Sequence, residues 1–98
     1  MTAPVEITIY TTRTCPYCRR AKDLLQKKNL AYREISVDGD FEARAQMTAR
    51  ANGRTTVPQI FFGETHIGGC DDLYDLHYDG KLESALAEAA RQAELENE

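Results

Sequence analysis

Two cysteines separated by two residues, Cys15 and Cys18, are the side chains of this sequence best suited to chemistry. Such a pair can close a small disulfide ring at the start of a helix without unwinding the backbone. Thiols in Cys-x-x-Cys motifs have pKa values of roughly 3.5 to 7.5, against about 8.5 for a free cysteine. The unpaired N–H groups and the dipole of a helix N-terminus also favour a thiolate. We therefore expect much of Cys15 to be thiolate at neutral pH, helped by the neighbouring Arg13, Arg19 and Arg20.

The two thiols are expected to have different roles, because only the first lies at the open end of the predicted helix. Cys15 would attack a disulfide sulfur, and Cys18, one turn further along, would resolve the mixed disulfide. A Cys-x-x-Cys pair can also form half of a zinc site, which here would need Cys70, His66 or His77. The spacing is not finger-like, so the sequence favours redox chemistry without a bound metal, with both histidines as surface or packing residues.

The bulk composition predicts one compact domain over residues 1–98, with a core of about 5–93 and an acidic tail at 94–98. The net charge of -4 argues against a nucleic-acid partner. No apolar run approaches the ~20 residues of a membrane span, so no membrane role is expected. The start lacks the basic and apolar segments of a secretory signal, which predicts a cytoplasmic protein. In the cytoplasm, disulfides are usually transient or catalytic.

Hydrophobic periodicity predicts elements in the order β-α-β-α-β-β-α-α. The first strand is expected to be half-buried, because apolar and polar residues alternate in it, and Thr14 is the expected N-cap of the first helix. The strand after that helix should run parallel to the first. The predicted strands are 5–11, 32–37, 59–62 and a short one around 66–67, and the predicted helices are 16–28, 40–51, 71–80 and 82–94. This order fits a thioredoxin-like α/β sandwich.

Two further segments carry unusual residues for their predicted places. Pro58 precedes a strand although it has no amide to donate. A cis Val57-Pro58 bond would turn the Val57 backbone outward to an extended peptide, and the alternative is an ordinary trans proline at a strand edge.

The second segment runs from Gly68 to Asp72 and is expected to form a tight turn and a helix N-terminus. A helix N-terminus binds carboxylates, and an acidic side chain there accepts from an ammonium, so this turn suits an amino-acid end group. The alternative is plain helix capping by Asp71 or Asp72. Cys70 is expected to be a small buried apolar residue rather than an extra redox-sensitive thiol.

From about Val5 to Asp79 the chain resembles the dithiol (class I) glutaredoxins, and most of all the bacterial glutaredoxin 3 type. The motifs that carry the resemblance are Cys15-Pro16-Tyr17-Cys18, Gly53-Arg54-Thr55-Thr56-Val57-Pro58-Gln59-Ile60-Phe61 and Ile67-Gly68-Gly69-Cys70-Asp71-Asp72-Leu73. The resemblance implies the glutaredoxin fold, a four-stranded mixed sheet flanked by helices, and a cis Pro58. It implies no tightly bound cofactor, with glutathione as the reducing cosubstrate.

The resemblance also implies a groove for glutathione beside the cysteines. Its residues would be Thr56 and Val57 for the cysteinyl part, Tyr17 as a wall, Pro58 as the floor, and Gly69, Cys70, Asp71 and Asp72 for the γ-glutamyl end. Many family members have a Lys three residues before the first cysteine for the glycyl carboxylate, but this chain has Thr12 there. Arg13 or Arg54 would have to supply that contact.

The function implied is that of a glutathione-disulfide oxidoreductase, monomeric and active in electron transport and cell redox homeostasis. It would reduce disulfide-bonded or glutathionylated proteins, and ribonucleotide reductase is one candidate target. Two alternatives stay open. One is a glutaredoxin-like protein reduced by thioredoxin reductase, which the turn at Gly68 to Asp72 disfavours. The other is an iron–sulfur carrier that uses Cys15 and glutathione as ligands, which Cys18 and Pro16 disfavour.

Overall fold

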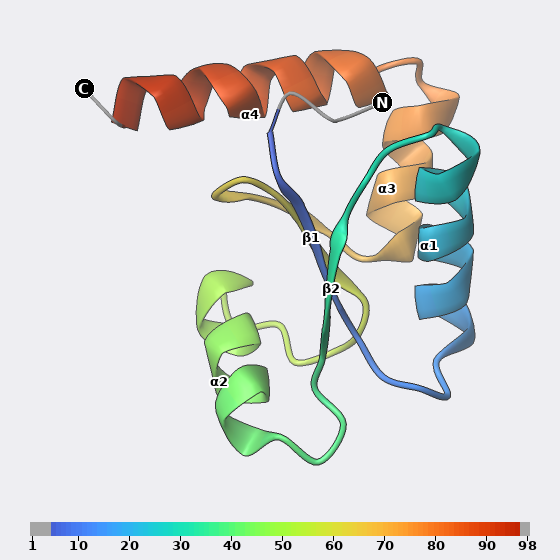
Figure 1. Ribbon diagram of the computed structural model, residues 1–98, viewed down its shortest axis with the longest axis vertical. Helices are drawn as coiled ribbons and strands as arrows, with labels where there is room; N and C mark the ends of the chain where they lie inside the picture. The colour runs from blue at the N-terminus through green and yellow to red at the C-terminus, as the bar shows by residue number, and fades with distance from the viewer. Residues whose placement is uncertain (1–4, 97–98) are drawn as a thin grey trace.

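The computed structural model describes residues 5–96, which form a mixed sheet and the helices that flank it (Figure 1). The elements are β1 (Ile7–Thr11), α1 (Pro16–Lys27), β2 (Arg33–Ser36), α2 (Phe41–Arg50), β3 (Gln59–Phe62), β4 (Thr65–Gly68), α3 (Cys70–Tyr78) and α4 (Leu82–Glu96). Their order confirms the predicted β-α-β-α-β-β-α-α sequence and the thioredoxin-like fold. The last helix continues two residues beyond the predicted end at Glu94, and residues 97–98 of the predicted tail lie outside the described residues.

The sheet has the strand order β2-β1-β3-β4, in which only β1 and β2 are parallel. The parallel pair confirms the predicted crossover through α1. Because β3 runs antiparallel to β1, Tyr10 near the end of β1 pairs with Gln59 at the start of β3. Gly68 at the end of β4 in turn pairs with Ile60. The segments that follow β1, precede β3 and follow β4 therefore meet at one edge of the sheet.

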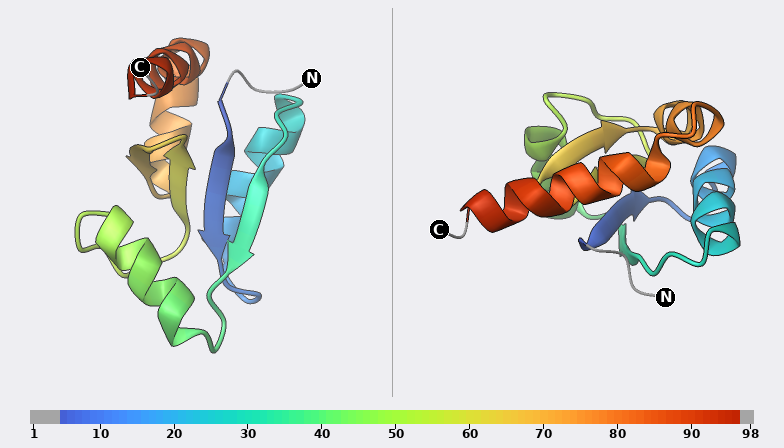
Figure 2. Two further views of the ribbon diagram at one scale, coloured as in Figure 1. Left: turned by 60° about the vertical axis from the view of Figure 1, so that its left-hand side comes forward. Right: turned by 90° about the horizontal axis from the view of Figure 1, so that it is seen from above.

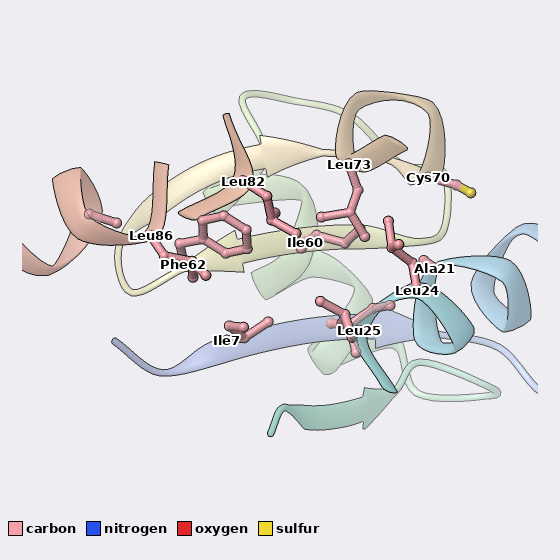
Figure 3. Close-up of a cluster of buried hydrophobic side chains, with 12 residues drawn as sticks. Ile7, Ala21, Leu24, Leu25, Ile60, Phe62, Cys70, Leu73, Leu82 and Leu86 are labelled. Carbon is pink, nitrogen blue, oxygen red and sulfur yellow. The ribbon is translucent and has the colours of Figure 1, made fainter. Parts of the chain in front are cut away.

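Helices cover both faces of the sheet, with α1 and α3 on one side and α2 on the other (Figure 2). On the first side Ile7 and Ile60 pack with Leu25 and Leu73, and α4 adds Leu86 (Figure 3). This cluster is the larger of the two hydrophobic cores.

The second core lies between the sheet and α2, where Tyr10 and Phe61 pack with Met47. As a result all five residues of β1 are buried, and the prediction of a half-buried strand is wrong. Alternation of apolar with polar residues usually marks a solvent-facing side. Here the second side carries Thr8 and Tyr10, which are polar enough to resemble an exposed face although α2 covers that side.

Local residues set both ends of α2. The Asp40 carboxylate accepts a hydrogen bond from the Ala43 N–H at 3.0 Å, which makes Asp40 the N-cap. The helix ends before Asn52 and Gly53, whose positive φ angles of 56° and 90° take the chain out of helical conformation. The chain is thereby returned toward the sheet edge where β3 begins.

Candidate active site

Cys15 is the N-cap residue of α1, with an extended backbone (φ −94°, ψ 109°). Its sulfur accepts a hydrogen bond from the Cys18 N–H at 3.1 Å, and its thiol donates toward the Val57 carbonyl oxygen at 3.7 Å. The prediction that Thr14 caps this helix is therefore wrong. Cys15 takes the position because its side chain supplies an acceptor that reaches the N–H three residues further on. Its sulfur thus lies among the first N–H groups of the helix, which stabilise negative charge.

Cys18 lies behind Cys15 and is only 1% exposed, whereas Cys15 is half-buried. Burial raises the pKa of the Cys18 thiol from 9.0 to about 12, and the hydrogen bond with Cys15 acts in the same direction. The Thr12 N–H and the charge of Lys22 oppose this rise of the pKa. At neutral pH Cys18 is therefore a thiol, and Cys15 is the sulfur of the pair that a substrate can reach.

A groove of about 340 Å³ runs beside the cysteine pair. It is lined by Tyr17, Arg54, Thr56, Val57, Pro58, Gly69, Cys70, Asp71 and Asp72. The structure therefore brings together every residue that the resemblance placed in a groove except Arg13. Cys15 adjoins this groove through its contact with Val57. The volume is within the range of small-molecule sites, which is about 300 to 1,000 Å³.

The loop before β3 forms one wall of the groove, and the Val57-Pro58 bond in it is cis, as the resemblance implied. The fully buried side chain of Gln59 anchors this loop to the core. Its amide nitrogen donates to the Thr56 carbonyl oxygen at 3.0 Å and to the Thr56 hydroxyl at 3.3 Å. The Gln59 amide oxygen is 2.7 Å from Nε2 of His66 on β4. No local sequence pattern indicates this network, since it depends on the register between two strands.

His66 is half-buried and packs against Phe61, which agrees with the expectation of a packing residue. Its Nδ1 extends the network to the Asn52 amide nitrogen, at 3.4 Å. Burial lowers the pKa of His66, and the nearby Arg54 guanidinium lowers it further. The neutral ring can donate from Nε2 to the Gln59 oxygen, because the Gln59 nitrogen already donates to Thr56. The chain Thr56, Gln59, His66 therefore fixes one wall of the groove to the sheet.

The opposite wall is the N-terminus of α3. Gly69 is the N-cap, and the Asp72 carboxylate accepts from the Gly69 N–H at 2.8 Å. Asp72 also pairs with Arg54, with 3.3 Å between Nη1 and Oδ2. The alternative of helix capping is therefore realised by Asp72, while the first N–H groups of α3 have no acceptor within the helix. Capping and groove formation coexist here, because the same turn does both.

Cys70 is the first residue of α3 and belongs to both the core and the groove. It is 4% exposed, and burial raises its pKa. Figure 3 shows its side chain at the edge of the larger hydrophobic cluster. This position agrees with the expectation of a small buried residue.

Arg13 lies on the other side of the cysteine pair, away from the groove. Its side chain is 90% exposed and its Nε is 3.9 Å from an Asp38 carboxylate oxygen. A second cavity, of about 370 Å³, lies on this side and is lined by both cysteines together with residues of β1, α1 and β2. Of the two arginines considered for a carboxylate contact, the structure places only Arg54 in the groove.

Within residues 5–96, no group of three or more His, Cys, Asp or Glu side chains is arranged to hold a metal ion. Among the helices of that same range, none is both long and apolar enough to cross a membrane.

Comparison with known proteins identifies the family. The sequence model of the Glutaredoxin family matches residues 7–67. Glutaredoxin from Pseudomonas aeruginosa is 57% identical over 81 residues, which is 83% of this chain and 95% of that protein. Glutaredoxin 3 of Escherichia coli is 52% identical over 80 residues, which is 82% of this chain and 95% of that protein.

A solved structure supports the same assignment. The crystal structure of a buckwheat glutaredoxin–glutathione complex aligns with a TM-score of 0.75 and 34% identity, over 89% of this chain and 81% of that one. The chain therefore belongs to the glutaredoxin family of thiol–disulfide oxidoreductases. The resemblance that the three motifs predicted is confirmed, including the Cys-x-x-Cys dithiol of Cys15 and Cys18.

Proposed function

We propose that this protein reduces protein disulfides and glutathione mixed disulfides in the cytoplasm, with glutathione as its reductant. The observation that carries the proposal is the placement of a half-buried Cys15, at a helix N-terminus, beside the groove, with the buried Cys18 one turn behind it. A binding protein for glutathione would need the groove, but it would not need a second thiol within hydrogen-bonding reach of the first.

In the proposed cycle the Cys15 thiolate attacks one sulfur of a substrate disulfide. A new S–S bond forms, the substrate S–S bond breaks, and the leaving thiolate takes a proton from solvent. With a protein disulfide, Cys18 then attacks Cys15, releases the second substrate thiol and leaves a Cys15–Cys18 disulfide. Two molecules of glutathione restore the dithiol and become glutathione disulfide.

The proposed glutathione site is the groove. Val57 would offer its backbone to the cysteinyl part, as an added strand does, and the free N–H groups of α3 would receive the γ-glutamyl carboxylate. Arg54 supplies the guanidinium of the groove for a carboxylate of the tripeptide, and Arg13 is the less favoured candidate. The glutathione in the related buckwheat structure supports a site of this kind.

The test of the proposed function supplies the protein with glutathione, glutathione reductase and NADPH and measures NADPH oxidation. One substrate is a glutathionylated peptide and the other is a peptide with an internal disulfide. Cys15→Ser should abolish both reactions, because it removes the attacking thiol. Cys18→Ser should retain the first reaction and impair the second, since only the second needs a resolving thiol.

Two outcomes would contradict this proposal. Equal loss of both reactions in the two variants would contradict the roles of the thiols. Turnover with thioredoxin reductase in place of glutathione, and none with glutathione, would favour the alternative reductant.

A further inference from the structure

The proposed resolving step requires a thiolate at Cys18, and the surroundings of Cys18 oppose one. The side chain is 1% exposed, and burial is the main cause of its raised pKa. The cavity on the Arg13 side is the part of the surface to which this thiol has access, because both cysteines line it. A group that assists the loss of the Cys18 proton is therefore to be sought among the charged residues of that cavity.

Four charged side chains line the cavity: Arg13 from the loop after β1, Arg19 and Lys22 from α1, and Glu34 from β2. Arg13 is almost fully exposed and turned to an aspartate, and Arg19 is exposed on the helix surface. From α3 the titratable group that faces the pair is Cys70, which interacts with Cys15.

Lys22 differs from these groups in its position and in its partners. It follows Cys18 by four residues on α1, so the two side chains lie on the same face of the helix, one turn apart. Its Nζ is 3.0 Å from Oε2 of Glu34, and the same oxygen accepts from the Thr11 hydroxyl at 2.7 Å. The Lys22 side chain is 29% exposed, and its ammonium is held by a carboxylate that Thr11 of β1 holds in turn.

The Lys22–Glu34 pair stays charged across the neutral range. The hydrogen bond from Thr11 lowers the pKa of Glu34, and Lys22 lowers it as well, so Glu34 remains a carboxylate. Glu34 is therefore a poor acceptor for the Cys18 proton and serves to hold the ammonium. Thr11, buried at 2% exposure, completes the arrangement from the neighbouring strand.

We propose that Lys22 is a positioning residue for the resolving step, in which its fixed ammonium stabilises the negative charge that develops on the Cys18 sulfur. This inference rests on the proposed function. The Cys18 proton leaves to water in the cavity, and the thiolate attacks Cys15. The Cys15–Cys18 bond forms as the bond from Cys15 to the substrate sulfur breaks, and the released thiolate takes a proton from solvent.

The mixed disulfide is the state in which Lys22 matters most. There Cys15 is neither a thiol nor a thiolate, so its hydrogen bond and its charge no longer raise the pKa of Cys18. What remains is burial, opposed by the Thr12 N–H and by the charge of Lys22, the side-chain charge among residues 5–96 that lowers this pKa. Substitution of Lys22 should therefore act on the resolving reaction and leave the attack by Cys15 unchanged.

The test is a charge series at this position: Lys22→Arg, Lys22→Gln and Lys22→Glu. Lys27→Gln, in the last turn of the same helix, is the matched control, because it removes an equal charge from an exposed site. The first readout is the rate at which iodoacetamide alkylates Cys18 between about pH 6 and 9, where lysine is charged, in a Cys15→Ser/Cys70→Ser background. The second is the pH profile of reduction of the internal peptide disulfide.

Alkylation of Cys18 in this pH range should slow in the order Arg, Gln, Glu, with Lys22→Arg and the Lys27 control close to the parent. If the pKa of Cys18 rises by one unit, the fraction of thiolate at a pH below the pKa falls tenfold. A thiolate of higher pKa is more nucleophilic, which offsets part of this fall, so the rate decreases by about threefold. We expect Lys22→Gln to slow the dithiol reaction by about twofold to threefold at neutral pH, and Lys22→Glu to slow it more. Added salt should reduce these differences.

The glutathionylated peptide provides the control for attack by Cys15. In a Cys18→Ser background, its reduction should be the same with and without the Lys22 substitutions. The proposal is overturned if Cys18 is alkylated at the same rate throughout the charge series, or if the Arg and Gln variants lose equally. A failure of the proposed function is distinguishable, because the unsubstituted protein would then show no glutathione-dependent turnover while the alkylation of Cys18 would still report on Lys22.

Discussion

Two thiols three residues apart acquire different chemistry here because of where the first turn of α1 places them. Cys15 caps the helix and keeps part of its surface exposed, whereas Cys18 points into the protein and is 1% exposed. Desolvation penalises only the charged form, so it raises the pKa of Cys18. The difference between the two thiols therefore follows from their positions in the first turn of α1, one at the surface and one buried.

The arginine of the groove leads to a prediction at the residue scale. In a Cys15→Ser background, which prevents turnover, Arg54→Ala should weaken glutathione binding by about threefold to tenfold, because a half-exposed guanidinium–carboxylate contact contributes about 1 kcal/mol. Arg13→Ala should bind like its parent, since its side chain lies outside the groove. Isothermal titration calorimetry measures both affinities. Equal affinity in the parent and in both variants would exclude an arginine contact.

At the scale of elements, the turn between β4 and α3 makes a sharper prediction. Gly68 has a φ of +121°, and a Cβ built on it would overlap the Asp72 carboxylate and lie 3.0 Å from the Arg54 guanidinium. Gly68→Ala should therefore displace the carboxylate that caps α3 as well as strain the backbone. We expect it to lower the free energy of unfolding by about 2 to 4 kcal/mol and to weaken glutathione binding.

Gly80 offers the matched control for that substitution. It also has a positive φ, of +70°, but a Cβ there would meet no atom within 4 Å. Gly80→Ala should cost about 1 kcal/mol through the backbone alone and leave glutathione affinity unchanged. Urea unfolding of the two variants measures the difference. Equal destabilisation would show that the contact with Asp72 has no energetic role.

The elements also show which features were readable from the sequence. Apolar periodicity placed the helices, because this signal is local. The burial of β1 on both faces was not readable, since it depends on α2 packing over Thr8 and Tyr10.

The same distinction holds within the candidate site. The three motifs that carry the resemblance located the groove, because each of them is a short run of sequence. The network from His66 through Gln59 to Thr56 was missed, because it forms only when β3 and β4 pair in their irregular register. It left no local pattern that sequence periodicity could detect.

At the scale of the whole molecule, the mixed sheet order explains why one edge carries all of these groups. Strand β1 ends where β3 begins, and β4 ends beside them, so three segments distant in sequence face one another. The cysteine motif then lies between the groove formed by the loop before β3 and α3, and the cavity formed with β2. The proposed binding of glutathione and the proposed release of the Cys18 proton therefore take place on opposite sides of the cysteine pair.

The stability of the whole reduced protein should also depend on the buried thiol. The pKa of Cys18 is about 12 in the folded protein and 9.0 as the reference for an unfolded chain. Between these pH values the Cys18 thiol is deprotonated in the unfolded chain and protonated in the folded protein. The contribution of this thiol to the free energy of unfolding is therefore at its full value below pH 9.0 and decreases as the pH rises above it. One such group lowers the free energy of unfolding by up to about 1.4 kcal/mol per pH unit.

Urea unfolding of the reduced protein at about pH 8 and about pH 10 tests this dependence, with Cys18→Ala as the control. The unsubstituted protein should lose about 1 kcal/mol more than the variant over this interval, because the tyrosines, the lysines and Cys70 titrate in both. The quantity compared is the change in the free energy of unfolding between the two pH values in each protein. The lower stability expected of the alanine variant at both pH values therefore cancels. Parallel losses in the two proteins would mean that the Cys18 thiol ionises as readily in the folded protein as in the unfolded chain.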